Sequence, residues 1–223
     1  MSAGVAAGRW SEPSRLEVHR LGRLDYAAAL AVQEAARDRV LAGGPEQVLL
    51  VEHPPVITLG RRGDARHVLA PIAPVLRVNR GGDVTYHGPG QLVGYPIIDL
   101  GRCERDVDRY LRALEAVVIA VAARCGLAAR RRRGFTGVWL GNAKLAAIGV
   151  GIRRWITMHG FALNVADLRR EFAAIVPCGL ADVGVTSLEE AMGARPAMAE
   201  VEALVVDEFL RVFEGVDDAE RRP

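Results

Sequence analysis

The stretch from Arg80 to Gln91 reads Arg-Gly-Gly-Asp-Val-Thr-Tyr-His-Gly-Pro-Gly-Gln, so four of its twelve residues are glycine and one is proline. A plain connecting turn needs only one or two such residues. Glycine also lets the backbone approach another group closely. Apolar runs at 75–78 and 92–98 flank the stretch and predict a buried strand on each side of it. We therefore expect this loop to lie at the centre of the fold.

Three side chains of this loop could take part in acid, base or hydrogen-bond chemistry: Asp83, Tyr86 and His87. Asp83 has no second carboxylate at a useful spacing, which leaves glycosidase-type chemistry without support. The loop also lacks the Gly-x-Gly-x-x-Gly and Gly-Lys-Ser/Thr patterns of phosphate-binding loops. His87 adjoins glycine and interrupts an apolar region, so we predict that it lies in a pocket.

The composition excludes several broad classes of protein. The chain has 223 residues, half of them hydrophobic, which is unlike a disordered protein. A net charge of +2 is too small to indicate nucleic-acid binding, and no apolar run reaches the ~20 residues of a membrane span. Cys103, Cys125 and Cys178 form no Cys-x-x-Cys pair, which disfavours a disulfide framework or a zinc site. Residues 1–14 do not resemble a signal peptide. We therefore expect a reducing, cytoplasmic setting.

Periodicity and capping signals predict many strands and a few helices. The predicted helices cover 25–41, 106–124, 167–172 and 198–213, and a further helix begins at Ser187 and Glu190, which are spaced as a capping box. The predicted strands cover 16–19, 47–52, 56–59, 75–79, 92–100, 137–140, 144–152 and 155–162, the last interrupted by His159-Gly160. The strands at 137–140 and 144–152 are expected to form a hairpin that bends at Gly141-Asn142. Asp25 is expected to cap the first helix, and Gly126 to end the helix at 106–124.

These elements do not alternate strictly as strand and helix. We predict an α+β fold with a mixed or mostly antiparallel sheet, in one domain spanning 15–215. Residues 1–14 are predicted to be a flexible tail and residues 216–223 a charged one. The arginine run 130–133 is expected in a turn, either as a solvated surface or as a docking patch for an acidic partner.

Cys178 and Lys144 are the strongest candidates for covalent chemistry. Cys178 lies between a proline and a glycine, which together can hold a side chain in a set direction. It could equally be a small buried hydrophobic residue. Lys144 is the single lysine among 29 lysines and arginines, and it stands at the mouth of an apolar strand. A partly desolvated amine beside a thiol is a sensible nucleophile-activating pair.

Histidine is the usual rival base. His87 and His159 both adjoin glycine within apolar runs, so a cysteine–histidine dyad stays open on these residues alone. We expect His53, which precedes two prolines, and His67, which lies in a polar loop, to be structural or exposed.

Three long segments together resemble one family, the lipoyl(octanoyl) transferases. They are the opening loop with its extension to Pro96, the segment from Gly137 to Val150 that contains Lys144, and the segment from His159 to Glu189 that contains Cys178. The match extends from about residue 16 to 213. Lys144 and Cys178 are 34 residues apart, which also agrees with the family.

The resemblance implies the fold of biotin and lipoate ligase catalytic domains, with neither a cofactor nor a metal. It implies transfer of an octanoyl group from acyl carrier protein to a lysine of lipoyl domains, in 2-oxoacid dehydrogenase complexes and in the glycine cleavage H protein. Cys178 matches the nucleophile that carries the acyl thioester, and Lys144 matches its activating partner. The residues that match the acyl-pocket segments are Arg80, Gly81, Gly82, Asp83, Val84, Thr85, Tyr86, His87, Ala147, Ile148, Gly149, Gly160, Phe161 and Ala162.

Two other functions remain open at this point. An ATP-dependent lipoate or biotin ligase of the same fold would activate the acid as an adenylate and would need no cysteine. The loop that continues from His87 with Gly-Pro-Gly-Gln, and the presence of Cys178, both argue against a ligase. A non-catalytic module that binds lipoyl or acyl groups is the other alternative, and a covalent adduct on Cys178 would exclude it.

Overall fold

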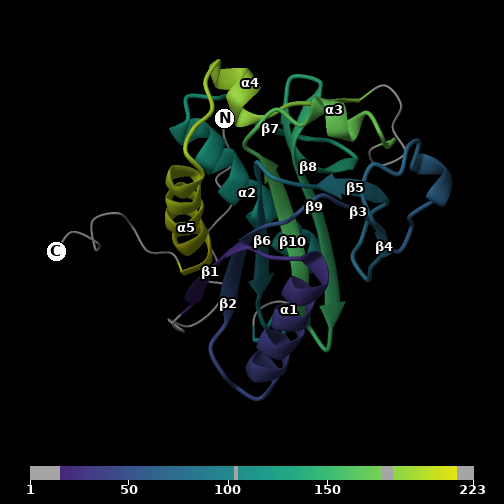
Figure 1. Ribbon diagram of the computed structural model, residues 1–223. Helices are drawn as coiled ribbons and strands as arrows, with labels where there is room; N and C mark the ends of the chain where they lie inside the picture. The colour runs from purple at the N-terminus through teal and green to yellow at the C-terminus, as the bar shows by residue number, and fades with distance from the viewer. Residues whose placement is uncertain (1–15, 103–104, 177–182, 215–223) are drawn as a thin grey trace.

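The computed structural model describes residues 16–102, 105–176 and 183–214 (Figure 1). Cys103, Cys178 and both predicted tails lie outside these ranges. The described chain forms two mixed sheets with helices packed against them. This is the α+β arrangement that the lack of strict strand–helix alternation predicts.

The larger sheet has eight strands, with the order β1-β2-β6-β10-β9-β8-β7 and with β11 paired to β9. Most neighbours are antiparallel, whereas β1–β2 and β9–β11 are parallel. Its strands are β1 (Glu17–Arg23), β2 (Gln47–Glu52), β6 (Gln91–Ile97), β7 (Arg130–Arg132), β8 (Phe135–Leu140), β9 (Ala143–Arg153), β10 (Ile156–Asn164) and β11 (Gly184–Val185).

Helices cover both faces of this sheet (Figure 1). Alternate residues of β2 show this directly, because Val48 and Leu50 join one core and Leu49 and Val51 join the other. The first core contains α2 (Val107–Arg124) and α5 (Met198–Glu214), and the second contains α1 (Tyr26–Leu41). A strand buried on both faces reads as a continuous apolar run, which is what β2 and β6 show.

The smaller sheet has the order β4-β3-β5 and lies beside the larger one, on the right in Figure 1. Its strands are β3 (Val56–Leu59), β4 (Val75–Arg77) and β5 (Val84–His87). Its core also takes in Phe172 of α3 (Arg169–Phe172). The remaining helices are the short 3-10 helix Ala65–His67 and α4 (Leu188–Met192). Within the ranges given above, no helix is long and apolar enough to cross a membrane.

The opening stretch is not a loop throughout, because residues 84–87 form β5. The strand pairs with β3, from Val56 opposite His87 to Leu59 opposite Val84. The strand predicted at 75–79 is present as β4, but it is shorter than predicted and is not buried. Strand β4 stops at Arg77, and Val75 is 40% exposed because β4 is an edge strand.

The first three arginines of the run form strand β7 (Arg130–Arg132), and only Arg133 lies in the predicted turn, at 133–134. Two arginines of β7 make contacts with other side chains of the protein. The Arg131 Nε donates to Glu115 Oε2 at 2.9 Å, while the Arg132 guanidinium carbon lies 5.1 Å from the Trp139 ring centre. Docking of an acidic partner would therefore depend mainly on the other two arginines of the run, Arg130 and Arg133.

Local signals elsewhere were partly correct. The hairpin of β8 and β9 bends at Gly141, whose φ is +56°, and Gly126 follows α2 with a φ of +76°. Ser187 caps α4 by accepting a hydrogen bond from the Glu190 amide at 3.1 Å. Asp25 precedes α1, but its side chain makes no capping hydrogen bond.

Candidate active site

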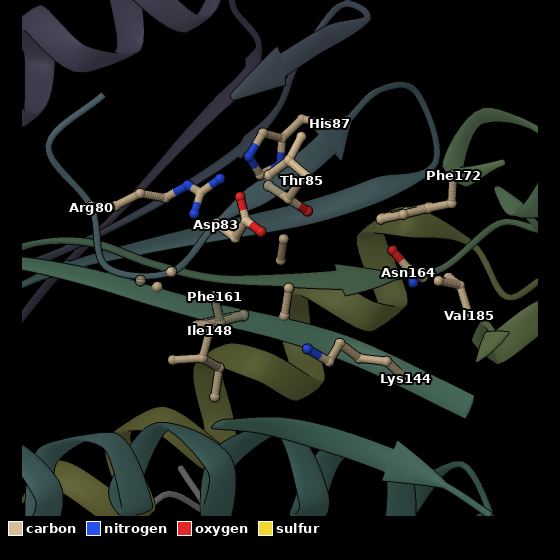
Figure 2. Close-up of a pocket in the computed structure, with 16 residues that line it drawn as sticks. Arg80, Asp83, Thr85, His87, Lys144, Ile148, Phe161, Asn164, Phe172 and Val185 are labelled. Atoms are coloured by element: carbon tan, nitrogen blue, oxygen red, sulfur yellow. The ribbon is translucent and has the colours of Figure 1, made fainter. Parts of the chain in front are cut away.

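A pocket opens between the two sheets, at the place where the 80–87 stretch faces β9 and β10 (Figure 2). The space not filled by atoms, including its open mouth, amounts to about 700 Å³. Its lining is mostly small or apolar. The lining residues are Arg80, Gly82, Asp83, Val84, Thr85, His87, Lys144, Ala147, Ile148, Gly149, Gly160, Phe161, Ala162, Asn164, Phe172 and Val185.

The glycine-rich loop is held tightly against β9. The Gly81 amide donates to the Val150 carbonyl at 2.8 Å. A Cβ on Gly149 would lie 2.9 Å from the Gly81 carbonyl oxygen, so only glycine permits this approach. Gly82 has a φ of +87°, which also favours glycine. These glycines thus bring the loop against β9 and fix one rim of the pocket.

Arg80 anchors the base of the loop. Its side chain is buried, and its Nη2 donates to both the carbonyl and the hydroxyl of Thr58, at 2.7 and 2.9 Å. Its Nη1 donates to the Gly81 carbonyl at 2.9 Å. A guanidinium with this many fixed partners contributes positive charge and rigidity to the pocket wall.

Lys144 lies on the opposite wall, on β9, and its amine points toward the middle of the pocket (Figure 2). The residue is only 7% exposed. Its Nζ lies 4.8 Å from the centre of the fully buried Trp139 ring, a cation–π contact. Gly137 packs beside the lysine stem, where a Cβ would lie 3.4 Å from the Lys144 Cε, in ordinary contact, but only 2.7 Å from the Ala146 carbonyl oxygen. The local sequence therefore orients this amine.

His87 lines the pocket, but both of its ring nitrogens are engaged. Nδ1 is 2.7 Å from Gln91 Oε1, and Nε2 is 3.4 Å from the Thr58 hydroxyl. The Gln91 amide nitrogen donates to Asn164 Oδ1 at 2.9 Å, which directs the Gln91 oxygen toward the imidazole. His87 therefore donates through Nδ1 in a neutral ring. This arrangement suits a pocket wall better than a proton acceptor.

The other buried histidines lie behind the pocket and do not line it. The His53 Nε2 is 2.8 Å from the Tyr95 hydroxyl, and the His159 Nδ1 is 3.4 Å from the Tyr26 hydroxyl. His159 has a φ of +56° within β10, yet the strand continues through it rather than breaking there as the sequence predicts. Neither residue lines the pocket with Lys144, so the geometry favours no base role for them.

These histidines should make the protein sensitive to acid. Burial, and after it the neighbouring His53 and Arg80, lowers the pKa of His87 to about 3. In the unfolded chain this pKa is about 6.5. Below pH 6.5 the unfolded state therefore binds more protons, so the free energy of unfolding falls as pH falls, until it levels off below the folded-state pKa. At pH 5 the loss from His87 is about 2 kcal/mol.

The test is denaturant unfolding of the wild type and His87→Asn at pH 7.5 and pH 5. The wild type should lose about 2 kcal/mol more between the two pH values than the variant does. The exposed His19 provides a matched control, since His19→Asn should keep the wild-type difference. Equal losses for the wild type and His87→Asn would contradict this assignment.

Asp83 reaches the pocket, but its carboxylate is already occupied. Oδ2 is 2.5 Å from the His67 Nδ1, and Oδ1 accepts from the Asp64 amide at 3.0 Å. Asp83 and His67 together tie the 60–67 segment to the loop. This explains why an aspartate stands here without a second carboxylate.

Two of the residues predicted for the pocket, Tyr86 and Gly81, are not among those that line it. Tyr86 points to the other face of β5, where its ring packs edge-on against Phe172 with centroids 6.0 Å apart. This follows from the alternation of side chains along a strand. Gly81 does not line this pocket, because its amide is turned to Val150.

Sequence reasoning did not single out three lining residues: Asn164, Phe172 and Val185. Asn164 Nδ2 donates to the Thr186 carbonyl at 3.0 Å, which links β10 to the segment after β11. The signal for Asn164 was its position two residues beyond Ala162 on the same face of the strand. Phe172 and Val185 arrive from distant segments, and no local pattern indicates them.

Cys178 lies outside the described residues. The described chain on either side of it is tied to the walls of the pocket. Before it, the Val176 amide donates to the His67 carbonyl at 2.8 Å. After it, Val185 pairs with Lys144, and the Thr186 amide donates to the Lys144 carbonyl at 3.0 Å.

Comparison with known proteins places this geometry in a family. Residues 25–210 match the model of the lipoyl protein ligase A/B catalytic domain. An octanoyltransferase from Geobacter metallireducens is 53% identical over 193 residues, covering 86% of this chain and 91% of that protein. An octanoyltransferase from Geotalea uraniireducens is 51% identical over 205 residues, covering 90% and 96%.

Solved structures show the same fold at low sequence identity. A lipoate-protein ligase A bound with ATP superimposes with a TM-score of 0.75 at 16% identity, covering 88% of this chain and 85% of that one. The biotin protein ligase of Aquifex aeolicus gives a TM-score of 0.51 at 11% identity, covering 89% and 69%. The two-sheet architecture is therefore that of the biotin and lipoate ligases, and the chain belongs to the lipoyl protein ligase A/B catalytic domain family.

Proposed function

We propose that this chain transfers an octanoyl group from the thioester of an acyl carrier protein to a lysine of a lipoyl domain, through an acyl thioester on Cys178. The observation that carries the proposal is the pocket, whose apolar lining suits a thin alkyl chain and whose wall presents the buried amine of Lys144. The relatives at about 50% identity that are named octanoyltransferases support the transfer itself.

The first step forms the acyl-enzyme. Lys144 takes the proton of the Cys178 thiol, and the thiolate attacks the donor carbonyl. The tetrahedral intermediate collapses with loss of the carrier thiolate, which takes the proton back from Lys144. Exchange of one thioester for another is nearly balanced in free energy, so the acyl group is held without activation by ATP.

The second step forms the amide. Lys144 takes one proton from the acceptor ammonium, and the resulting amine attacks the Cys178 thioester. The Cys178 sulfur leaves as a thiol with the second amine proton, and Lys144 then gives its proton to solvent. Both steps pass through an oxyanion that needs hydrogen-bond donors. The Gly81 amide already donates to Val150. This leaves the Gly82 amide and those of Cys178 and Gly179 as the candidates.

The acceptors that fit this chemistry are the lipoyl domains of 2-oxoacid dehydrogenase complexes and the glycine cleavage H protein. A reactive thiolate requires a reducing compartment, so we place the reaction in the cytoplasm. The reaction needs no cofactor and no metal.

The decisive experiment mixes the protein with octanoyl-carrier protein in the absence of ATP and maps the acyl group by mass spectrometry. The octanoyl group should appear on Cys178 and should pass to an added lipoyl domain. Cys178→Ala should form no adduct, and Cys125→Ala, which removes a half-buried thiol elsewhere, should behave as the wild type. An absolute requirement for ATP, or an adduct at another residue, would contradict the proposal.

A further inference from the structure

A second hollow adjoins the acyl pocket and shares part of its wall. The two have Gly82, Asp83, Lys144, Ile148 and Gly149 in common. The shared residues include the amine at which the reaction is proposed to occur. Lys144 therefore lies where the acyl pocket meets the second hollow. The acyl pocket is lined largely by β10 and the smaller sheet, whereas the second hollow is also lined by residues of α2 and β8.

The second hollow has an apolar floor. Ile148 and Val150 of β9 contribute to it, together with Val107 and Leu111 from the first turns of α2 and Phe135 at the start of β8. Each of these side chains is buried or half-buried. A flexible chain with few charges could lie along this floor, from Lys144 toward the solvent.

Two arginines stand at the rim of this hollow. Arg61 and Arg62 line it, and both are exposed. In the parts of the chain that the structure describes, neither guanidinium has a carboxylate within ion-pair distance. The carboxylate that does line the hollow, Asp83, is held by His67.

The backbone fixes these arginines beside the site. The Arg61 amide donates to the Arg80 carbonyl at 2.9 Å, and the Arg62 amide donates to the Gly82 carbonyl at 3.2 Å. Gly60 permits this contact, because a Cβ there would lie 2.5 Å from the Gly82 carbonyl oxygen. The turn that bears both cations is thus bound to the same loop that forms the rim of the acyl pocket.

We propose that the second hollow receives the phosphopantetheine arm of the donor, with Arg61 and Arg62 binding its phosphate. The inference rests on the proposed function. A thioester carbonyl held at Lys144 has two substituents, the acyl chain and the pantetheine arm, which must extend from it in different directions. The acyl chain fills the first pocket, so the arm takes the second. The arm is a weakly polar chain that ends in a phosphate, an anionic diester where it joins the carrier protein, which matches the floor and the two arginines.

The acceptor lysine is the rival occupant. Its amine carries a positive charge before it reacts, and two arginines at the rim, without an ion-pair partner among the described residues, disfavour it electrostatically. The carrier thiol leaves before the acceptor arrives, so each half-reaction can be measured on its own. The two occupants can therefore be separated by experiment.

The test compares two small donors, octanoyl-phosphopantetheine and octanoyl-pantetheine, which differ only in the phosphate. Acyl-enzyme formation in the wild type should be about 10- to 100-fold more efficient, as kcat/KM, with the phosphorylated donor. In the double variant Arg61→Gln, Arg62→Gln this preference should disappear. Transfer from preformed acyl-enzyme to a lipoyl domain should be unchanged in that variant.

The matched control is the double variant Arg20→Gln, Arg23→Gln. It removes the same charge from β1, at the far edge of the larger sheet, and should keep the wild-type preference. Equal loss with both donors in Arg61→Gln, Arg62→Gln would overturn the phosphate assignment, and so would selective slowing of transfer to the acceptor. Absence of acyl-enzyme in the wild type with either donor would instead overturn the proposed function.

Discussion

Replacing Lys144 by arginine should reduce octanoyl transfer by about 10²- to 10⁴-fold, the range of a lost general acid–base group. Arginine keeps the positive charge but does not give up its proton in proteins. A purely electrostatic role for Lys144 would survive this exchange, whereas a proton-transfer role would not. Both half-reactions should suffer, because the proposed mechanism uses the same amine in each.

The measurement is single-turnover acyl-enzyme formation and, separately, transfer to a lipoyl domain. Arg133→Lys is a matched control, since it makes the reverse exchange at an exposed position and should leave both rates within about twofold. Thermal unfolding of the two variants checks that each is folded. A near-normal rate for Lys144→Arg would end the proposal that a cysteine and a lysine act as a pair.

Glu115→Gln should lower the free energy of unfolding by about 2–4 kcal/mol. The Glu115 carboxylate is fully buried and accepts from Arg112 at 2.6 Å, from Arg131 at 2.9 Å and from the Gly137 amide at 3.1 Å. Glutamine keeps the size but loses the charge that strengthens these bonds. The estimate is below that for a wholly buried pair, because both arginines are more than 40% exposed.

Denaturant unfolding at neutral pH measures this loss. Glu202→Gln removes a more superficial partner, which lies 3.5 Å from Arg20 and is 19% exposed, and should cost less than about 1 kcal/mol. The contrast matters for the site, because Glu115 fixes the Gly137 amide and Gly137 packs beside the Lys144 stem. Similar losses in the two variants would show that the buried carboxylate contributes no more than a surface pair.

Local patterns in the sequence correctly predicted the helices and turns that are determined by residues close together in the chain. The apolar stripe of α2 and the glycine that follows it gave the helix and its end, and Gly141 gave the bend between β8 and β9. The resemblance to lipoyl(octanoyl) transferases supplied the fold, which the structural neighbours confirm. The helix and turn signals lie in short stretches of chain, whereas the fold was inferred from long matching motifs.

The elements that failed depend on distant partners. Residues 84–87 form a strand only because β3 pairs with them, and the arginines of β7 are extended because β8 lies alongside and Glu115 lies beneath. Neither partner is visible in the local sequence. Tyr86 does not line the pocket for a related reason: in a strand at 84–87, neighbouring side chains face opposite ways.

In the candidate site, too, residues within the recognised motifs were predicted, whereas residues brought in by the fold were not. Motif matching placed Lys144 and most of the 80–87 stretch in the set that the structure brings to one pocket. Phe172 and Val185 complete that pocket from segments brought together only by the fold. The role of Cys178 remains a prediction that the acyl-mapping experiment tests.

In the described part of the chain, β1 and β7 end the larger sheet and β4 ends one side of the smaller sheet, and each of these three strands carries arginine. An open sheet edge exposes unpaired backbone groups that can recruit a strand from another copy, and charged side chains oppose such recruitment. Strand β7 consists of three arginines in a row, so a second copy brought against it meets like charge at every residue. The run that first looked like a docking patch thus also protects the protein against edge-to-edge aggregation.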